Sequence, residues 1–355
     1  MDARCRSGYV ITFIIMAVLV CIFFVANTKS VGASPEAPMV LSLSSWGTDK
    51  EPAIPSWLQM DKDLQEATKG RVKLKIYHAE TLGKAKEHYE IALKGIADIA
   101  YLNISFTPGR FPITDLVTFS YAPSAVAMTE GLIELQKKGY LNKEYQNVKL
   151  LQVFTGGPLA FLWRKGCKAE TSLDGLKGKK IRIPGMAARD LLTAVGAAPV
   201  SIPMPEVYTA LERGVMDAVF STTEVYDTFR IAHVSNEITK ANIFTFAFCI
   251  LMNKNSWEKL PKEAKDVLDK NSRKYALMAA GQHDHDDKTA IENNKPKVYN
   301  LPASDTKRIK EIMAPSVKAY IEKYEAAGYP MKKAAKDYYM FMKQKYGEEP
   351  FILDF

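Results

Sequence analysis

The strand-like segment Lys179–Pro184 reads KKIRIP and carries Arg182 between two isoleucines. Strands of parallel sheets are buried on both faces, so a guanidinium there is costly unless it reaches water or an anion. A proline and a glycine follow directly, which places Arg182 at the end of its strand. Arginine binds a carboxylate through two parallel hydrogen bonds and stays charged at physiological pH. Arg182 is therefore a candidate anion-binding residue, with an internal ion pair to Glu206 or Asp190 as the alternative.

Other segments with reactive side chains give weaker signals. The tract HDHDD at His283–Asp287 contains metal-binding residue types, but helix neighbours one and two apart do not face one another, so a solvated polar helix face is favoured. The TGGP segment at 155–158 lacks a lysine at phosphate-loop spacing and is expected to form a hinge or turn. The sequence has no Gly-x-Ser-x-Gly, His-Glu-x-x-His or paired-cysteine zinc motif. We therefore predict no catalytic residue, no metal and no cofactor.

Two short segments repeat one helix-to-strand phrase. Lys94–Asp98 reads KGIAD and Arg213–Asp217 reads RGVMD. Each glycine can end a helix in the left-handed conformation, after which the chain enters a strand. In open α/β sheets, ligands bind beyond the carboxyl ends of the strands. We interpret the repeat as a sign of two lobes, each of which directs the end of a strand toward a shared crevice. The alternative is a chance similarity between two short sequence segments.

The segments around these phrases alternate between strand and helix periodicity. This alternation at short spacings predicts crossover units and mainly parallel sheets. From residue 260 onward the chain is expected to be mostly helical, with a boundary near residue 302. The expected strands are 40–46, 71–77, 97–102, 148–154, 179–184, 215–220 and 243–253, and the expected helices are 55–68, 84–94, 129–138, 186–195 and 205–213.

Composition and the N-terminus indicate an exported globular protein. Of the 355 residues, 47% are apolar and 25% charged. Two arginines precede the uncharged run Tyr9–Ala26, and Val31–Ala33 has the small residues of a cleavage site. We predict a signal peptide at residues 1–33 and a periplasmic body, with a retained membrane anchor as the alternative.

Charge and cysteine usage narrow the possible partners. The formal net charge of +8 is spread along the chain, which does not favour nucleic-acid binding. Beyond the predicted signal, the chain contains Cys167 and Cys249. They could form a disulfide in an oxidising compartment, or they could be ordinary buried thiols.

Several segments, in order, resemble the solute receptors of tripartite ATP-independent periplasmic (TRAP) transporters. They are TSLDGLKGKKIRIPG, GAAPVSIPMPEVYTALERGVMDAV and ILMNKNSWEKLP, extended toward the N-terminus by GRVKLKIYHAETLGKAKEHYEIALKGIADIAY and YLNISFTPGRFP. The resemblance covers most of residues 40–275. It implies an α/β two-lobed periplasmic binding protein fold (Venus-flytrap), each lobe a mainly parallel sheet flanked by helices. It also implies strands that cross between the lobes and a long helix that spans both.

The resemblance suggests lobe boundaries as well. Lobe I is expected to comprise residues 34–160 and about 247–290. Lobe II is expected to comprise residues 161–246 and about 291–355, with the C-terminal helices packing on both lobes.

The resemblance further implies which residues face the ligand. The signature arginine of the family corresponds to Arg182. Met204 takes a position that is often aromatic in relatives, Ser221 the position of a ligand-contacting asparagine, and Asn103 a position that is often acidic. A second arginine of sialic-acid-type members is absent, and Arg164 lies nearby out of register. The predicted ligand-binding residues are Arg182, Trp46, Tyr101, Asn103, Met204, Ser221 and Phe246.

These residues predict a binding function. We expect the protein to capture a small carboxylate and deliver it to the two integral membrane subunits of a TRAP transporter. Because Trp46, Tyr101, Met204 and Phe246 are plausible walls, a monocarboxylate with an apolar or aromatic body is favoured over a dicarboxylate or a sulfonate. A ligand-sensing module and, less favoured, a secreted hydrolase are the alternatives.

Overall fold

The computed structural model describes residues 37–120 and 124–347. The predicted signal peptide lies outside these residues. From Val40 onward the chain forms one compact unit. In this part of the chain, no helix has the length and apolarity needed to cross a membrane. Cys167 and Cys249 are both free thiols, so the alternative of a disulfide between them is not realised.

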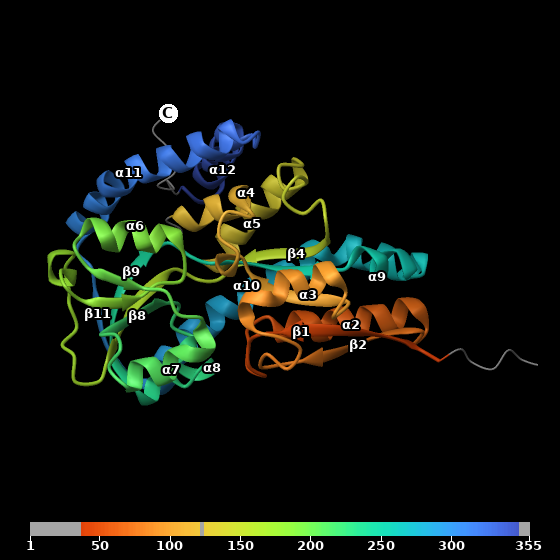
Figure 1. The fold of residues 1–355 in the computed structure, drawn as a ribbon, viewed down its shortest axis with the longest axis horizontal. Helices are drawn as coiled ribbons and strands as arrows, with labels where there is room; N and C mark the ends of the chain where they lie inside the picture. The colour runs from red at the N-terminus through yellow and green to blue at the C-terminus, as the bar shows by residue number, and fades with distance from the viewer. Residues whose placement is uncertain (1–36, 121–123, 348–355) are drawn as a thin grey trace, which may run out of the picture. The chain divides into compact units, whose positions relative to one another are not determined.

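The first sheet has five strands (Figure 1). Its first two strands in the chain, β1 and β2, are neighbours and are joined by helix α2. Strands β1 and β3 are parallel, whereas β10 runs antiparallel to both β3 and β4. The helices that pack on this sheet are α2 (Ile54–Thr68), α3 (His88–Lys94) and α5 (Ala125–Lys137). In spatial order the strands are β2 (Val72–Tyr77), β1 (Met39–Ser45), β3 (Ile99–Asn103), β10 (Ala247–Met252) and β4 (Lys149–Thr155). We call this sheet with its helices the first lobe.

The second sheet has six strands, of which only β5 runs antiparallel to its two neighbours. Helix α6 (Met186–Ala194) lies on one side of it and α7 (Met204–Glu212) on the other (Figure 1). In spatial order the strands are β11 (Lys297–Asn300), β9 (Ser235–Ile243), β5 (Leu159–Arg164), β8 (Ala218–Ser221), β6 (Lys180–Arg182) and β7 (Ala198–Val200). We call this sheet, with α6, α7 and the short α8 (Val225–Thr228), the second lobe.

Two chain segments cross side by side between the sheets. One joins β4 to β5 through the TGGP segment, and the other joins β9 to β10. Thr155 pairs with Ala247, and Leu159 pairs with Ile243. The expected hinge at TGGP is therefore one of the two crossings. The expected continuous strand 243–253 is wrong at its start, because the second crossing turns through left-handed residues before β10 begins.

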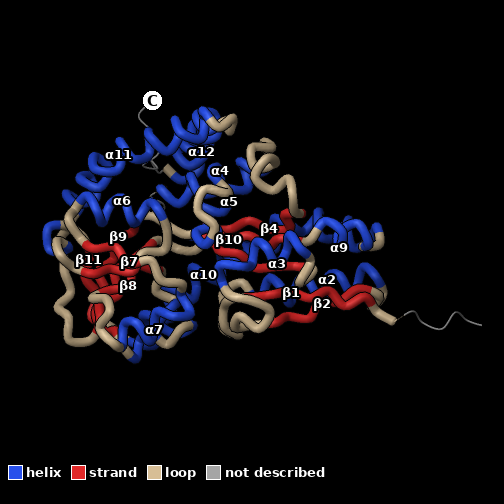
Figure 2. Tube along the Cα trace, viewed as in Figure 1, coloured by secondary structure: helices blue, strands red, loops and turns tan. Residues whose placement is uncertain are grey.

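Helix α10 (Lys262–Asn294) contacts both lobes. Its 33 residues span about 50 Å at roughly 1.5 Å per residue. It packs on α2, α5 and β4 of the first lobe and on α8 of the second (Figure 2). The predicted crossing strands and spanning helix are thus both present.

The remaining helices lie mainly after α10. Helix α11 (Ala303–Ala326) contacts α6, and α12 (Met331–Tyr346) contacts α5 and α4 (Pro112–Leu116). Helix α9 (Lys254–Lys259) precedes α10. Single 3-10 turns occupy Ala85–Glu87, Ile104–Phe106, Val117–Phe119, Asp174–Leu176 and Ile231–His233.

The repeated phrase ends a helix in the same way in both lobes. Gly95 follows α3 with φ of 69°, and Gly214 follows α7 with φ of 71°. A residue with a side chain is strained in this left-handed region, whereas glycine is not. The predicted role of the two glycines is confirmed.

The aspartate of each phrase fastens a neighbouring parallel strand. Asp98 accepts a hydrogen bond from the backbone N–H of Ser42 at 2.8 Å, and Asp217 accepts one from Lys180 at 2.8 Å. In each case the donor lies one residue before the first paired residue of β1 or β6. Both lobes therefore contain the same local structure, a glycine that ends a helix and an aspartate that binds the neighbouring parallel strand. This structure aligns the carboxyl ends of two strands in each lobe.

Candidate ligand-binding cleft

Four strands end at the gap between the lobes. Trp46 follows β1, and Asn103, Arg182 and Ser221 are the last residues of β3, β6 and β8. Because the carboxyl ends of parallel strands lie at one edge of each sheet, these side chains collect at the place where such folds bind ligands.

The lobes touch across this gap at two places. At one, Trp46 stacks on Phe229 with ring centroids 6.2 Å apart, and Thr48 donates a hydrogen bond to the backbone oxygen of Thr228 at 3.2 Å. At the other, a small hollow is lined by Ser105 of the first lobe, by 184–188 of the second and by Phe246 of a crossing segment. Trp46 and Phe246 take part in these contacts, and all the predicted residues are buried.

The guanidinium of Arg182 is buried without a carboxylate partner. Its side chain is 3% exposed, Nε donates to the backbone oxygen of Ile202 at 3.0 Å, and Nη1 is buried with no hydrogen-bond partner. No Asp or Glu in the described ranges forms an ion pair with it, so the alternatives with Glu206 and Asp190 are not realised. Burial lowers the pKa of Arg182 to about 10, at which the group remains charged near neutral pH.

Aromatic rings form the wall of the first lobe. Trp46 stacks on Tyr101 with centroids 5.4 Å apart and an interplanar angle of 13°. Both rings also contact Phe248 of β10, which in turn lies 5.8 Å from Phe246. The indole nitrogen of Trp46 is buried and has no hydrogen-bond partner. Three predicted residues thus meet in one apolar surface with a single unsatisfied donor.

The other predicted residues border Arg182 or the facing strand end. Met204 begins α7, two residues after the carbonyl that holds Arg182, and it is buried. Ser221 is buried at the end of β8, which pairs with β6. Asn103 is committed in part to local structure, since its Oδ1 accepts hydrogen bonds from the backbone and hydroxyl of Ser105.

In the second sheet, Arg164 lies at the end of the strands that is opposite to the end where Arg182 lies. It is the last residue of β5, which runs antiparallel to β8, and its backbone N–H donates to the carbonyl of Asp217 at the start of β8. Its side chain therefore does not replace the second arginine of sialic-acid-type receptors.

Glu51 is a buried residue of this region that the sequence analysis missed. Its side chain is 5% exposed, Oε2 accepts a long 3.4 Å hydrogen bond from the Tyr101 hydroxyl, and Oε1 is buried without a partner. Burial raises the pKa of Glu51 to about 8. The only sequence signal was its place in the loop directly after β1, at a carboxyl strand end, and acidic loop residues are usually solvated.

The HDHDD tract is not a solvated face. His283 is 1% exposed, and burial lowers its pKa to about 3, so the imidazole is neutral. Asp284 accepts hydrogen bonds from the first two backbone N–H groups of α5, and Asp287 accepts them from Thr223 and Glu224 ahead of α8. Within the described residues, no cluster of His, Cys, Asp and Glu could hold a metal ion. The favoured interpretation of this tract as a solvated face was therefore wrong for His283, Asp284 and Asp287, whereas His285 is exposed as expected.

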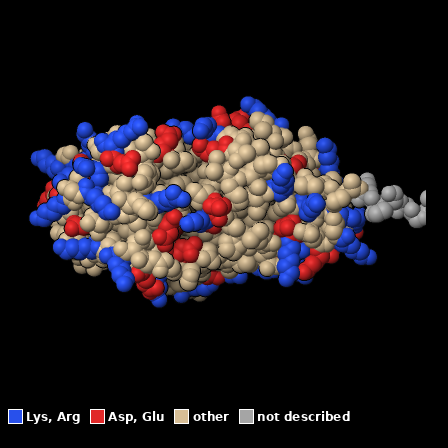
Figure 3. Space-filling model, turned by 90° about the horizontal axis from the view of Figure 1, so that it is seen from below, with Lys and Arg blue, Asp and Glu red and all other residues tan. Residues whose placement is uncertain are grey.

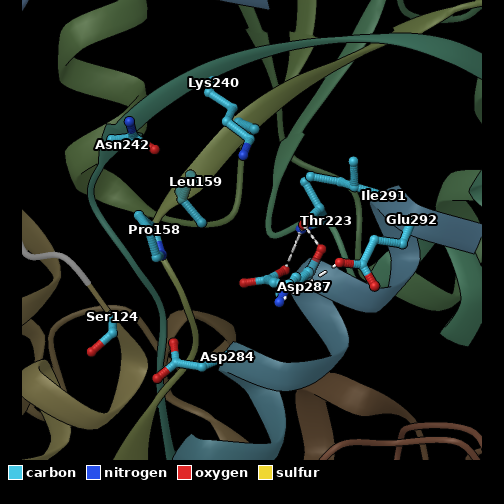
Figure 4. Close-up of a pocket in the computed structure, with 12 residues that line it drawn as sticks. Ser124, Pro158, Leu159, Thr223, Lys240, Asn242, Asp284, Asp287, Ile291 and Glu292 are labelled. Atoms are coloured by element: carbon cyan, nitrogen blue, oxygen red, sulfur yellow. Dashed lines mark hydrogen bonds and ion pairs between the residues drawn. The ribbon is translucent and has the colours of Figure 1, made fainter. Parts of the chain in front are cut away.

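A larger hollow of about 460 Å³ borders the crossing segments at Pro158 and Leu159 (Figure 4). Lys240 and Asn242 of β9, Leu159 of β5 and Asp287 of α10 point into it (Figure 4). It contains none of the predicted ligand-binding residues and is bordered by the elements that connect the lobes. We therefore treat it as part of the hinge and not as the ligand site.

On the face shown in Figure 3, surface charge does not single out another site. Lys and Arg are scattered there and interspersed with Asp and Glu. A polyanion-binding surface would gather one sign of charge.

Comparisons with known proteins agree with this geometry. The family model described as bacterial extracellular solute-binding protein, family 7, matches residues 43–323. A solute-binding protein of Albidiferax ferrireducens is 25% identical over 265 residues, which cover 70% of this chain and 75% of that protein.

Solved structures show the same fold. A TRAP periplasmic solute binding protein from Desulfovibrio salexigens, in an open complex, is 26% identical with a TM-score of 0.76, and the match covers 88% of this chain and 98% of that one. A marine metagenome TRAP solute binding protein, specific for aromatic acid ligands, is 24% identical with a TM-score of 0.80, over 87% of this chain and 99% of that one. With its two crossed lobes and strand-end arginine, the chain belongs to family 7 of the bacterial extracellular solute-binding proteins, the DctP-type solute receptors of TRAP transporters.

Proposed function

We propose that the protein captures a small carboxylate between its lobes, that Arg182 binds the acid group, and that the loaded protein delivers it to the membrane subunits of a TRAP transporter. The observation that carries this proposal is the buried guanidinium with an unpaired Nη1. A buried charge without a partner is strongly unfavourable, and a ligand carboxylate would supply both the countercharge and the missing acceptor.

Ligand binding would also hold the lobes together. A ligand favours the closed form only if it interacts better with both lobes than with either alone. Arg182, Met204 and Ser221 belong to the second lobe, whereas Trp46, Tyr101 and Asn103 belong to the first. The division of the contacts between two sheets supplies the required difference in affinity.

The body of the ligand is proposed to be apolar or aromatic. Trp46, Tyr101 and Phe246 are joined through Phe248 into a ring surface, and buried Met204 is proposed to contact the ligand from the second lobe. A flat ring stacked there gains favourable burial and ring contacts. The aromatic-acid specificity of the marine metagenome relative makes aromatic monocarboxylates the natural first probes.

Export and lobe boundaries complete the proposal. Residues 1–33 are proposed to direct export and to be removed. Residues 34–160 with about 247–290 are proposed as lobe I, and 161–246 with about 291–355 as lobe II. We expect the protein to release its ligand unchanged, as the receptors of its family do.

The first test is the loss of the arginine. We expect Arg182→Ala to weaken phenylacetate or benzoate binding by about 2–5 kcal/mol, because a buried charge pair loses one partner. Isothermal titration calorimetry would measure this, after native mass spectrometry has identified any co-purified acid. Arg164→Ala is the matched control, since Arg164 belongs to the same sheet but lies at the opposite end of its strands. Unchanged affinity in Arg182→Ala would refute the assigned role.

A further inference from the structure

Two glutamates of this chain are equally buried but differently satisfied. Glu51 and Glu144 are each 5% exposed, and burial raises the pKa of each to about 8. Glu144 accepts hydrogen bonds from the backbone of Ile113 and from the backbone and hydroxyl of Thr114, so it serves as the cap of α4. Glu51 accepts only the 3.4 Å bond from Tyr101. One glutamate thus has an evident structural role, and the other has an unused acceptor.

Glu51 lies in the loop that follows β1, and its carboxyl group is packed beneath that loop. A Cβ at Gly47 would lie 2.2 Å from Cγ of Glu51, so the loop folds back on its own glutamate. The carboxyl group ends beside the hydroxyl of Tyr101, whose ring stacks on Trp46. It forms no ion pair with Arg182. The acid thus follows a strand end of the first lobe, and the guanidinium lies at a strand end of the second.

A second buried acid lies close to the first. Glu224 of the second lobe is 6% exposed, and Oε2 has no hydrogen-bond partner. The Tyr101 hydroxyl experiences the charge of Glu51 and then of Glu224, after the larger effect of burial, and its pKa is raised. Nδ1 of His283 lies 3.7 Å from Oε1 of Glu224, and neither ring nitrogen has a hydrogen-bond partner. Burial lowers the pKa of His283, so the ring is neutral. Around Glu51 and Glu224 the described residues therefore present buried acceptors that form no ion pair with Lys or Arg.

Leaving such acceptors unpaired in the interior destabilises the folded protein. A donor brought by the ligand removes this cost. We propose that these acceptors, with Glu51 as the main one, recognise a hydrogen-bond donor of the ligand. The ligand is then an organic acid that carries a hydroxyl group or a protonated amine at the end opposite its carboxylate. This inference rests on the proposed carboxylate-binding function.

The test compares acids that differ only in the distal donor. The probes are phenylacetate, its 3- and 4-hydroxy derivatives, and its 3- and 4-aminomethyl derivatives. We expect at least one donor-bearing acid to bind the wild-type protein tenfold or more tightly than phenylacetate in calorimetric titrations. Equal affinity of phenylacetate and all four derivatives would overturn the inference and leave the role of Arg182 intact. Failure of all five acids to bind would count against the carboxylate site itself.

Substitutions assign the preference to the glutamate. Glu51→Met keeps the volume but removes the acceptors, and we expect the affinity ratio of the preferred acid to phenylacetate to fall to within about threefold of unity. Glu144→Gln, the control of equal burial outside the cleft, should retain the ratio. If the affinity ratio of the preferred acid to phenylacetate is unchanged in Glu51→Met, Glu51 is not the acceptor. Arg182→Ala should weaken every acid together, which separates the two claims.

A third variant distinguishes the two donor classes. Glu51→Gln keeps a carbonyl oxygen that accepts from a hydroxyl group, but it cannot take on the negative charge that the carboxyl group would acquire beside a protonated amine. A preference for a hydroxy acid should therefore survive in part, whereas a preference for an aminomethyl acid should be lost. Both outcomes support a distal donor and decide its chemistry.

Discussion

Asp217 holds the first residue of β6, the three-residue strand that ends at Arg182. Its Oδ2 accepts the backbone N–H of Lys180 at 2.8 Å, and its own N–H donates to the carbonyl of Lys180 at 2.7 Å. Strand β6 has only three residues, and Arg182 is the last of them. An error at the start of so short a strand is carried directly to its end. We therefore regard Asp217 as a positioning residue for the anion site.

This role predicts different effects for two substitutions. Asp217→Ala removes the acceptor of the exposed Lys180 N–H, which water can then bind, and should destabilise the protein by about 0.5–1.5 kcal/mol. Acid binding should weaken as well, because Arg182 is no longer held. Asp217→Asn keeps one acceptor oxygen and should retain most of both properties. Urea unfolding and calorimetry measure the two effects, and wild-type affinity in a destabilised Asp217→Ala protein would show that the aspartate is only structural.

At the scale of elements, two aspartates of α10 cap a helix in each lobe, beside further bonds such as Tyr275 to Asp63 and Asn294 to Asp227. Asp284 and Asp287 are three residues apart, so they share a face of the helix. Asp284 accepts from Ala125 at 2.6 Å in the first lobe, and Asp287 accepts from Thr223 at 2.6 Å in the second. Capping bonds of this kind satisfy N–H groups that a helix start leaves free. The spanning helix is thus fastened to both sides of the hinge at adjacent points.

Removing each tie should loosen one lobe selectively. We expect Asp287→Ala to cost about 1 kcal/mol of stability and to increase hydrogen exchange in 222–228, whereas Asp284→Ala should do so in 124–130. Asp286→Ala is the control, because Asp286 accepts only from Gln282 of its own helix. Exchange that rises equally in both segments for either variant would contradict separate ties.

At the scale of the whole molecule, buried acids and buried histidines set opposite pH dependences. Burial raises the pKa of Glu51 and Glu144 to about 8 from an ordinary 4.5, and that of Asp115 to about 6. The folded state therefore binds more protons, and the stability from these groups is full below pH 4.5 and lost as pH rises through 8. Burial lowers the pKa of His283 from 6.5 to about 3, so its contribution is full above pH 6.5 and lost in acid.

Above pH 6.5 the contribution of His283 to the stability no longer changes with pH, whereas the contributions of the buried carboxyl groups still do. We therefore expect the melting temperature to fall between pH 6.5 and 8.5 in the ligand-free protein. Glu51→Gln should reduce the fall, because the variant lacks one of the two titrating glutamates. Differential scanning calorimetry at constant ionic strength measures both curves. A melting temperature that rises over this window, or a variant as pH-sensitive as the wild type, would contradict the assignment.

Local pattern in the chain predicted much of each lobe but not the full sheets. Strands β1, β2, β3, β4, β6 and helices α2, α6 and α7 lie close to their expected bounds, since alternation, helical periodicity and glycine stops are short-range signals. Strands β5, β7, β9 and β11 were not expected. The antiparallel β5 is a short apolar run that periodicity alone cannot assign, and β9 has mixed polarity along its length.

The sequence by itself determined the family, the left-handed glycines and an arginine at a strand end, because each depends on residues close together in the chain. The tertiary structure decided that Arg182 has no internal counterion and that Glu51 is buried with an unused acceptor. It also decided that the aspartates of HDHDD cap helices in both lobes. These features depend on which distant segments meet, and burial and pairing of polar groups arise only from that meeting.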